Sequence, residues 1–216
     1  MEHINIAIDG TSGSGKSTAA KNVASALGIE YIDTGAMYRA AALKAVTLGI
    51  DISDEKAVEK MMKDTDIDFS NGCIYLDGEN VNGKIRTLEI SAAASEISKL
   101  AACRRILVEI QQRIAEKKSV VMDGRDIGTN VLPDASHKFY IHASLEVRAQ
   151  RRLAELKEKN EEADLDSVLK DLAIRDENDM NRKLNPLRKA DGAIEICTDD
   201  MTVEGVRDYI LSHVNS

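Results

Sequence analysis

The sequence of 216 residues has no tryptophan, two prolines and only 3% aromatic residues. Its core must therefore be filled by alanine and long aliphatic side chains, and long helices are favoured over rigid linkers. The three cysteines are odd in number and contain no CxxC pair, which is a poor basis for a disulfide framework. They are Cys73, Cys103 and Cys197. We expect reduced thiols in a cytoplasmic protein.

The sequence also lacks a long hydrophobic run. No window approaches the length of a membrane-spanning helix, and Glu2 and Asp9 interrupt the N-terminal apolar run, so we expect neither a signal peptide nor a membrane partner. The formal net charge of −8 disfavours a nucleic-acid partner, although it allows a small phosphorylated ligand. Because no segment has the pattern of an unsatisfied apolar stripe, we expect a monomer.

Short apolar runs alternate with helical patterns along most of the chain. The runs "INIAI", "VVM", "FYI" and "IEI" are continuously apolar, as strands buried on both faces should be. The alternation predicts an α/β fold with a central parallel sheet covered by helices on both faces. Residues 66–86 differ, because turn pairs separate short alternating runs, and we interpret them as a small β-rich insertion in a single domain of residues 1–216. The pairs are Asn71-Gly72, Asp77-Gly78 and Asn82-Gly83.

The strongest motif is "GTSGSGKS", which matches G-x-x-x-x-G-K-[S/T] in full, after a strand and before a helix. Its glycines allow backbone N–H groups to approach a phosphate, and the following helix adds its positive N-terminal end. Lys16 can reach the β- and γ-phosphates, and the Ser17 hydroxyl can ligate Mg²⁺. The motif predicts an ATP-type site formed by Gly10, Thr11, Ser12, Gly13, Ser14, Gly15, Lys16, Ser17 and Thr18. No NKxD sequence follows, which disfavours a GTPase switch.

Two further charged stretches, "YIDTGAMYR" and "MDGRDIGT", follow predicted strand ends, where ligands bind in open α/β sheets. The first supplies Thr34 and Arg39. The second places Asp123 where an acid that helps to hold Mg²⁺ belongs, with Arg125 and Asp126 on the same loop. The structural alternatives are an exposed helical arginine and a simple turn.

A third stretch, "IRDENDMNR", places Arg175, Asp179 and Arg182 on one face of a helix, where a solvated, salt-bridged surface is the alternative. The cations that could converge are Lys16, Arg39, Arg125, Arg175 and Arg182. They exceed what one MgATP requires. Since guanidinium groups pair with phosphate oxygens, a second phosphorylated substrate would explain the surplus, which suggests a nucleoside monophosphate kinase.

Five blocks carry a family resemblance: "IDGTSGSGKST", "YIDTGAMYR", "NGKIRTLEISAAAS", "VMDGRDIGT" and "RDENDMNR". In this order and spacing, they resemble the bacterial cytidylate (CMP/dCMP) kinases over essentially the full length of the chain. The resemblance implies a three-layer P-loop kinase fold, with residues 66–86 as the insertion on the monophosphate side. It also implies a helical lid at residues 155–182, with its tip at 159–165.

The resemblance further implies roles for single residues. Ser95 and Arg104, together with Asp126, would contact the cytosine edge. Arg39 and Arg125 would bind the CMP phosphate, Thr34 would belong to the same CMP site, and Asp179 would hold the ribose hydroxyls. Arg175 and Arg182 would reach the transferring phosphoryl group, with Asp176 and Glu177 on the outer, solvated face of the helix. Arg151 and Arg152 would flank the adenine of ATP, with a solvated helix face as the alternative.

The expected reaction is in-line transfer of the γ-phosphoryl group of MgATP to CMP or dCMP. The phosphate oxygen is already a nucleophile, so catalysis consists of positioning and charge stabilisation by Lys16, Arg125, Arg175 and Arg182. Two alternatives stay open: a P-loop kinase for another acceptor (UMP, shikimate or dephospho-coenzyme A), and a nucleotide-dependent binding module without catalysis.

Overall fold

The computed structural model describes residues 3–70, 72–158 and 162–214. By their internal contacts they form two compact units. Unit 1 consists of Met1–His3 and Glu30–Val120, and unit 2 of Ile4–Ile29 and Val121–Ser216. None of the helices in the described ranges combines the length and the apolar character that a membrane-spanning helix needs.

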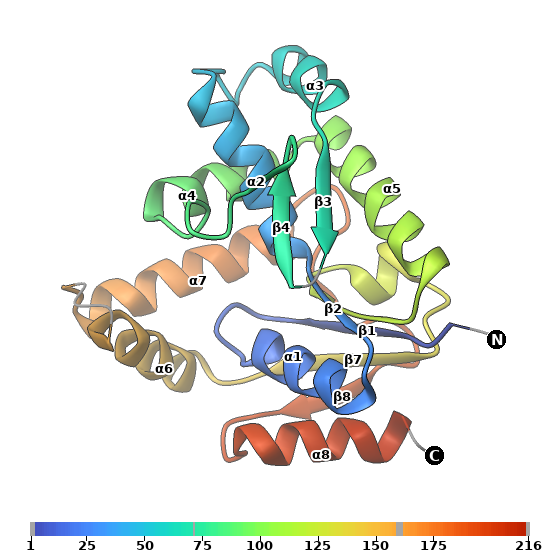
Figure 1. The fold of residues 1–216 in the computed structure, drawn as a ribbon. Helices are drawn as coiled ribbons and strands as arrows, with labels where there is room; N and C mark the ends of the chain where they lie inside the picture. The colour runs from blue at the N-terminus through green and yellow to red at the C-terminus, as the bar shows by residue number, and fades with distance from the viewer. Residues whose placement is uncertain (1–2, 71, 159–161, 215–216) are drawn as a thin grey trace. The chain divides into compact units, whose positions relative to one another are not determined.

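Unit 2 is built on parallel strands with helices between them (Figure 1). The strands follow the order β6-β1-β7-β8 within a central sheet of five strands, whose fifth strand, β2 (Glu30–Asp33), is grouped with unit 1. The four strands of unit 2 are β1 (Asn5–Gly10), β6 (Val120–Gly124), β7 (His137–His142) and β8 (Ile194–Cys197). In the parallel pairing of β1 with β7, Ile8 is opposite Phe139.

The apolar runs of these strands form the core of unit 2. Ile6, Ile8, Met122, Phe139 and Ile141 are all buried. Side chains that are buried on both faces of a sheet are the mark of parallel strands covered by helices. The α/β fold with a central parallel sheet, which the sequence predicts, is therefore confirmed.

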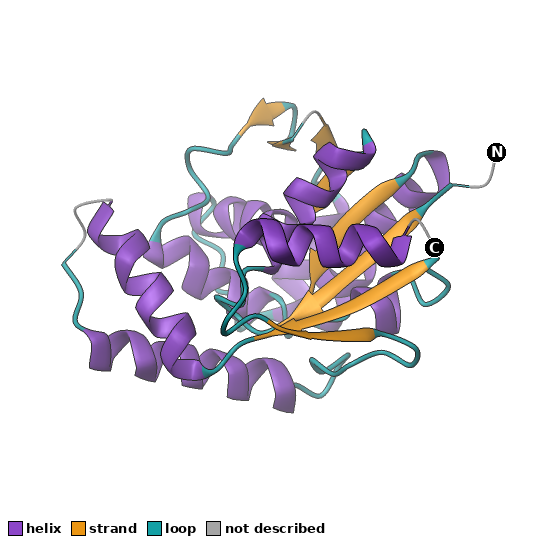
Figure 2. Cartoon of the chain, turned by 90° about the horizontal axis from the view of Figure 1, so that it is seen from below, coloured by secondary structure: helices purple, strands orange, loops and turns teal. Residues whose placement is uncertain are grey.

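The helical elements of unit 2 are α1 (Lys16–Leu27), α6 (Leu145–Glu158), α7 (Leu165–Asn181), α8 (Val203–Val214) and a π-helical turn at Ile127–Val131. Helices α1 and α8 lie side by side, and Figure 2 shows α8, next to the C label, lying across the strands. Helices α6 and α7 form a hairpin (Figure 1). Buried apolar side chains join them: Ala149, Leu156, Val168 and Leu172.

Unit 1 contains helices and a second, antiparallel sheet of order β3-β4-β5. Its helices are α2 (Thr34–Thr47), α3 (Glu55–Lys63), α4 (Leu88–Ile97) and α5 (Ala101–Lys117). The strands are β3 (Ile67–Ser70), β4 (Cys73–Leu76) and β5 (Glu79–Asn80). These strands lie within residues 66–86, and that this segment is an insertion in the domain stays a prediction.

The turns of the insertion explain its sequence. Asp77 and Gly78 connect β4 to β5 and have positive φ angles of 49° and 82°, which is why the short polar residue and the glycine stand there. Residue Asn71 of the predicted turn before β4 lies outside the described residues. Ile67, Phe69 and Ile74 turn inward and are buried, so the small sheet has one apolar face.

Candidate active site

The glycine loop, residues Gly10–Ser17, leads from the end of β1 into α1. A Cβ atom on Gly10 would lie 1.8 Å from the Ile141 carbonyl oxygen of β7, so only glycine fits there. Gly13 and Gly15 have φ angles of 77° and 86°, in the left-handed region that favours glycine. No side chain caps the N-terminus of α1. Its first N–H groups and the positive end of its dipole are therefore available to a phosphate.

Lys16 lies within this loop and is buried, with Nζ donating to the Thr11 carbonyl oxygen at 3.1 Å. Burial, together with the nearby Arg125 guanidinium, lowers the pKa of Lys16 to about 7, although the carboxylates of Asp123 and Asp179 act in the opposite direction. A bound anion would raise the pKa of Lys16, as the two carboxylates do, and so would favour the charged ammonium. The geometry thus suits a lysine whose partner is a phosphate.

Ser17 and Asp123 meet at the carboxyl ends of β1 and β6, where Ser17 Oγ donates to Asp123 Oδ2 at 2.7 Å. Both groups are oxygen ligands of the kind that Mg²⁺ prefers. Among the described residues there is no cluster of three or more His, Cys, Asp or Glu side chains that could hold a metal by itself. A Mg²⁺ site with few protein ligands fits a cation that also binds substrate phosphates and water.

Two arginine–carboxylate pairs join Arg125 and Asp126, which directly follow β6, to the end of α7. Arg125 Nε donates to Asp179 Oδ2 at 2.6 Å, and Arg182 Nη2 donates to Asp126 Oδ1 at 2.9 Å. Burial acts to raise the pKa of Asp179, but the charges of Arg125, Arg182 and Arg175 outweigh it and hold that pKa below its usual value. Four of the predicted site residues are therefore neighbours in unit 2.

The structure corrects two details of the predicted helix stripe. Helix α7 ends at Asn181, and Arg182 has the extended angles φ −62° and ψ 142°, so Arg182 does not share a helix face with Arg175 and Asp179. In this non-helical conformation, Arg182 Nε donates to the Asn185 carbonyl oxygen and Arg182 Nη2 donates to Asp126.

The second correction concerns Asp176, which was expected on the solvated face with Glu177. Its carboxylate forms an ion pair with Arg148 at 2.7 Å, and its side chain is only 13% exposed. Glu177 is exposed, as expected. The charge pattern of the sequence therefore does not distinguish the paired carboxylate of Asp176 from the exposed carboxylate of Glu177. The expected lid tip, 159–165, falls partly outside the described residues.

Sequence reasoning missed Arg148. The residue is buried on α6, donates to the carbonyl oxygens of Ser12 and Ala143, and pairs with Asp176 of α7. It thus joins the glycine loop to both helices of the hairpin. In the sequence it is one of several arginines in "VRAQRR", and only its position one turn from the helix start distinguishes it.

Asp9 was also missed. It is the single acid of β1, next to the last residue of that strand, and is 2% exposed. Its two carboxylate oxygens accept hydrogen bonds from the N–H groups of Ile127 and Gly128, each at 2.8 Å. Burial raises the pKa of Asp9 to about 6, against the lowering effect of these two hydrogen bonds. Asp9 therefore anchors the loop that carries Arg125 and Asp126, and a charged residue ending a buried strand could have signalled this.

The two arginines expected near adenine differ in their surroundings. Arg151 donates to the hydroxyl and the carbonyl oxygen of Thr198, at 3.1 and 2.6 Å, and the Thr198 hydroxyl donates to the carbonyl oxygen of Ser14. Arg151 is thus connected to the glycine loop through one threonine. Arg152 pairs with Glu155 on the exposed helix surface, as in the solvated alternative.

Unit 1 holds the remaining predicted residues in two places. At the start of α2, Thr34 is buried and Arg39 pairs with Asp33 at 3.1 Å. Between α4 and α5, Ser98 Oγ donates to the Ser95 carbonyl oxygen, and Arg104 Nη1 donates to the Ser98 carbonyl oxygen at 3.2 Å.

Arg104 belongs to none of the sequence motifs. The residue is 3% exposed, and its guanidinium carbon lies 5.7 Å from the centroid of the Tyr38 ring. A buried guanidinium over an aromatic ring is held in place, and its planar donors suit the edge of a base. Ser95 and Arg104 are thus both hydrogen-bonded to Ser98 in unit 1, while Asp126 belongs to unit 2.

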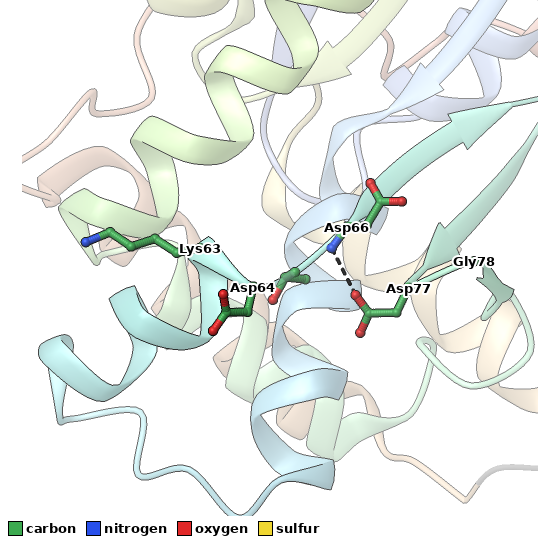
Figure 3. A pocket seen from close by; sticks show the side chains of 6 residues that line it. Lys63, Asp64, Asp66, Asp77 and Gly78 are labelled. Atoms are coloured by element: carbon green, nitrogen blue, oxygen red, sulfur yellow. Dashed lines mark hydrogen bonds between the residues drawn. The ribbon is translucent and has the colours of Figure 1, made fainter.

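A surface hollow of about 550 Å³ lies elsewhere in unit 1 (Figure 3). It is lined by Lys63, Asp64, Thr65, Asp66, Asp77 and Gly78. The Asp66 N–H donates to Asp77 Oδ1 across it at 2.9 Å. None of the predicted site residues lines this hollow, and its carboxylates would repel a phosphorylated substrate.

Comparison with known proteins gives consistent matches. The family model described as "Cytidylate kinase" matches residues 6–216. The cytidylate kinase of Clostridioides difficile (strain 630) is 46% identical over 215 residues, covering 100% of both chains. That of Caldanaerobacter subterraneus subsp. tengcongensis is 49% identical, over 96% of this chain and 92% of its own. A solved structure of an uncharacterised protein from Eubacterium ventriosum shares the fold, with 16% identity, 99% coverage of both chains and a TM-score of 0.56.

Proposed function

Because the chain belongs to the cytidylate kinase family, we propose that it transfers the γ-phosphoryl group of MgATP to CMP or dCMP, giving ADP and CDP or dCDP. The observation that carries the proposal is the arrangement in unit 2. There, a complete glycine loop with buried Lys16 lies beside the Ser17–Asp123 contact and two arginine–carboxylate pairs.

The glycine loop is the half of the site that would hold ATP. The N–H groups at the start of α1 would receive the phosphates, with Lys16 at the β- and γ-phosphates. Ser17 and Asp123 would hold Mg²⁺, which neutralises phosphate charge when bound. Arg151 would stand at the adenine side, held by Thr198.

The arginines supply the charge stabilisation. Phosphoryl transfer needs the attacking and leaving oxygens in line and the charge on the transferred group neutralised. Arg125, Arg175 and Arg182 would contact the transferring group and the acceptor phosphate. The carboxylate partners of Arg125 and Arg182 keep these two guanidinium groups oriented before the substrates bind, which limits reorganisation during the reaction. Asp179 would in addition hold the ribose hydroxyls.

Unit 1 carries the residues proposed for the acceptor nucleotide. Arg39 would contact the CMP phosphate, and Thr34 would line the CMP site. Ser95 and Arg104 would contact the cytosine edge, with Asp126 of unit 2 as the third base contact. A fork of guanidinium donors and a hydroxyl fit the carbonyl and ring nitrogen acceptors of cytosine.

An acceptor panel tests the proposal. ADP release from MgATP would be measured with CMP, dCMP, UMP, AMP, GMP and without acceptor. Turnover with the cytidine nucleotides alone is the expected result. Equal turnover across acceptors would keep a kinase and reject the base contacts of Ser95, Arg104 and Asp126. Slow hydrolysis without acceptor dependence would replace the proposal with a nucleotide-dependent binding module.

We further propose a monomeric protein of the cytoplasm that works on small-molecule substrates without nucleic-acid or membrane partners. Sedimentation equilibrium at micromolar concentration tests the monomer, and a doubled mass would contradict it.

A further inference from the structure

One carboxylate in unit 1 is shared by two arginines. Asp33, at the end of β2, accepts a hydrogen bond from the Ala36 N–H through Oδ1 and so caps helix α2. Its Oδ2 lies 3.1 Å from Arg39 Nη2 and 3.1 Å from Arg86 Nη2. The two guanidinium nitrogens can therefore be no more than twice that distance apart.

The charge of this cluster is not balanced within itself. Two guanidinium groups and one carboxylate leave one net positive charge, and like charges at this separation repel each other. The buried Nε of Arg39 has no hydrogen-bond partner among the described residues, and the Arg86 side chain is 57% exposed. Both arginines thus have donors left for an anion, which would also relieve their mutual repulsion.

The backbone around Arg86 is fixed on both sides. Ile85 before it is 1% exposed and anchored in the core of unit 1. Thr87 after it caps α4, since its Oγ1 accepts from the Ile90 N–H at 3.2 Å. The backbone at Arg86, the last residue of the 66–86 segment, is therefore anchored. Less conformational entropy is lost when its guanidinium binds a ligand than on an unanchored loop.

The start of helix α2 adds to the same cluster. Asp33 caps this helix of 14 residues, whose positive dipole end favours an anion. A Cβ atom on Gly35 would lie 3.2 Å from both Arg39 Nη1 and Asp33 Oδ1, so the glycine lets the charged groups close around the helix end.

We propose that Arg86 binds the phosphate of the acceptor nucleotide together with Arg39, and that the β-rich insertion serves to deliver it. This inference rests on the proposed function and adds a residue to its acceptor site. The competing explanation is that Arg86 only helps Asp33 to hold the start of α2.

Calorimetric titration of the full-length chain with CMP and with cytidine, which lacks the phosphate, separates the two explanations. The Arg86→Gln variant should bind CMP roughly tenfold more weakly, the loss expected for one charge-assisted hydrogen bond, with unchanged cytidine affinity. The Arg86→Lys variant keeps the charge but not the two-pronged guanidinium donor. Its CMP affinity should lie between those of the wild type and Arg86→Gln. Arg113→Gln is the matched control, because Arg113 is an exposed arginine of the same unit.

A structural role predicts a different pattern. Unchanged CMP affinity in Arg86→Gln, or an equal loss for CMP and cytidine, would overturn the inference while leaving the kinase proposal intact. If Arg86→Gln fails to fold, a CMP affinity of Arg86→Lys equal to that of the wild type would overturn it. A wild-type chain that binds no CMP would overturn the proposed function and this inference with it.

Discussion

At the scale of single residues, the glycine loop depends on space at Gly10. The Gly10→Ala variant would place Cβ 1.8 Å from the Ile141 carbonyl oxygen, a backbone atom of β7 that cannot turn aside. We expect a loss of about 3 kcal/mol or more in the free energy of unfolding, since overpacking forces the backbone to shift. Urea denaturation measures it.

The matched control is Gly83→Ala, because a Cβ atom there would meet no atom within 4 Å. This control should stay within about 0.5 kcal/mol of the wild type. A Gly10→Ala protein with the same urea midpoint as the control would show that β1 and β7 can separate without cost.

Asp9 gives a pH-dependent prediction at the same scale. Its pKa in the folded protein, about 6, lies above its ordinary value of 3.8 because of burial. The folded state therefore binds the proton more tightly than the unfolded chain. This group contributes stability below pH 3.8, and the contribution is lost as the pH rises through 6. Arg125 and Asp126 also face Asp9, with opposite effects on its pKa.

The Asp9→Asn variant cannot titrate at this position. We expect the unfolding free energy of the wild type, relative to this variant, to fall by about 2 kcal/mol between pH 4.5 and pH 7. Urea unfolding of both proteins over this pH range provides the measurement. Two parallel pH profiles would mean that the carboxyl group titrates as in the unfolded chain.

At the scale of elements, Arg148 connects three segments: the glycine loop, the start of α6 and helix α7. Arg148→Ala would leave the Asp176 carboxylate and two carbonyl oxygens without their donor. We expect a loss of about 3 kcal/mol in the free energy of unfolding, at the lower end for a broken buried ion pair because Asp176 is partly exposed.

The control for this prediction is Arg152→Ala on the same helix, where the arginine pairs with exposed Glu155. Its effect should be within about 0.5 kcal/mol. Equal losses in the two variants would show that the three segments are held by the apolar contacts of the hairpin alone.

The elements also show what a sequence can predict. The glycine loop and the Asp77-Gly78 turn are local features, because their backbone angles are set by the residues that occupy them. Helix α7 ends before Arg182, whose side chain contacts Asp126 and Asn185. Asp126 is distant in the sequence, and Asn185 lies outside any helix. The partner of Asp176 lies on another helix. Such contacts depend on tertiary packing and leave no periodic signal.

At the scale of the whole molecule, a net charge of −8 coexists with clusters of guanidinium groups in both units. Each cluster is held by carboxylates: Asp33 in unit 1, and Asp126 and Asp179 in unit 2. These carboxylates keep the arginines ordered in a protein without ligand, so the acidic composition does not argue against phosphorylated substrates. The carboxylates also limit which anions bind, because an anion must compete with them for the guanidinium groups.

Turnover by the whole protein gives the last prediction, for Arg182→Ala. The glycine loop is untouched by this change, so ATP affinity should stay within about twofold, whereas kcat should fall by roughly 10³ or more, the contribution of an arginine aimed at the transferring group. The variant leaves buried Asp126 without this cation, so its folding is checked first by thermal unfolding. Arg182→Lys, which keeps the charge but not the fork, should recover part of kcat. A folded Arg182→Ala protein with near-normal turnover would remove Arg182 from the catalytic residues, and its pair with Asp126 would then be structural.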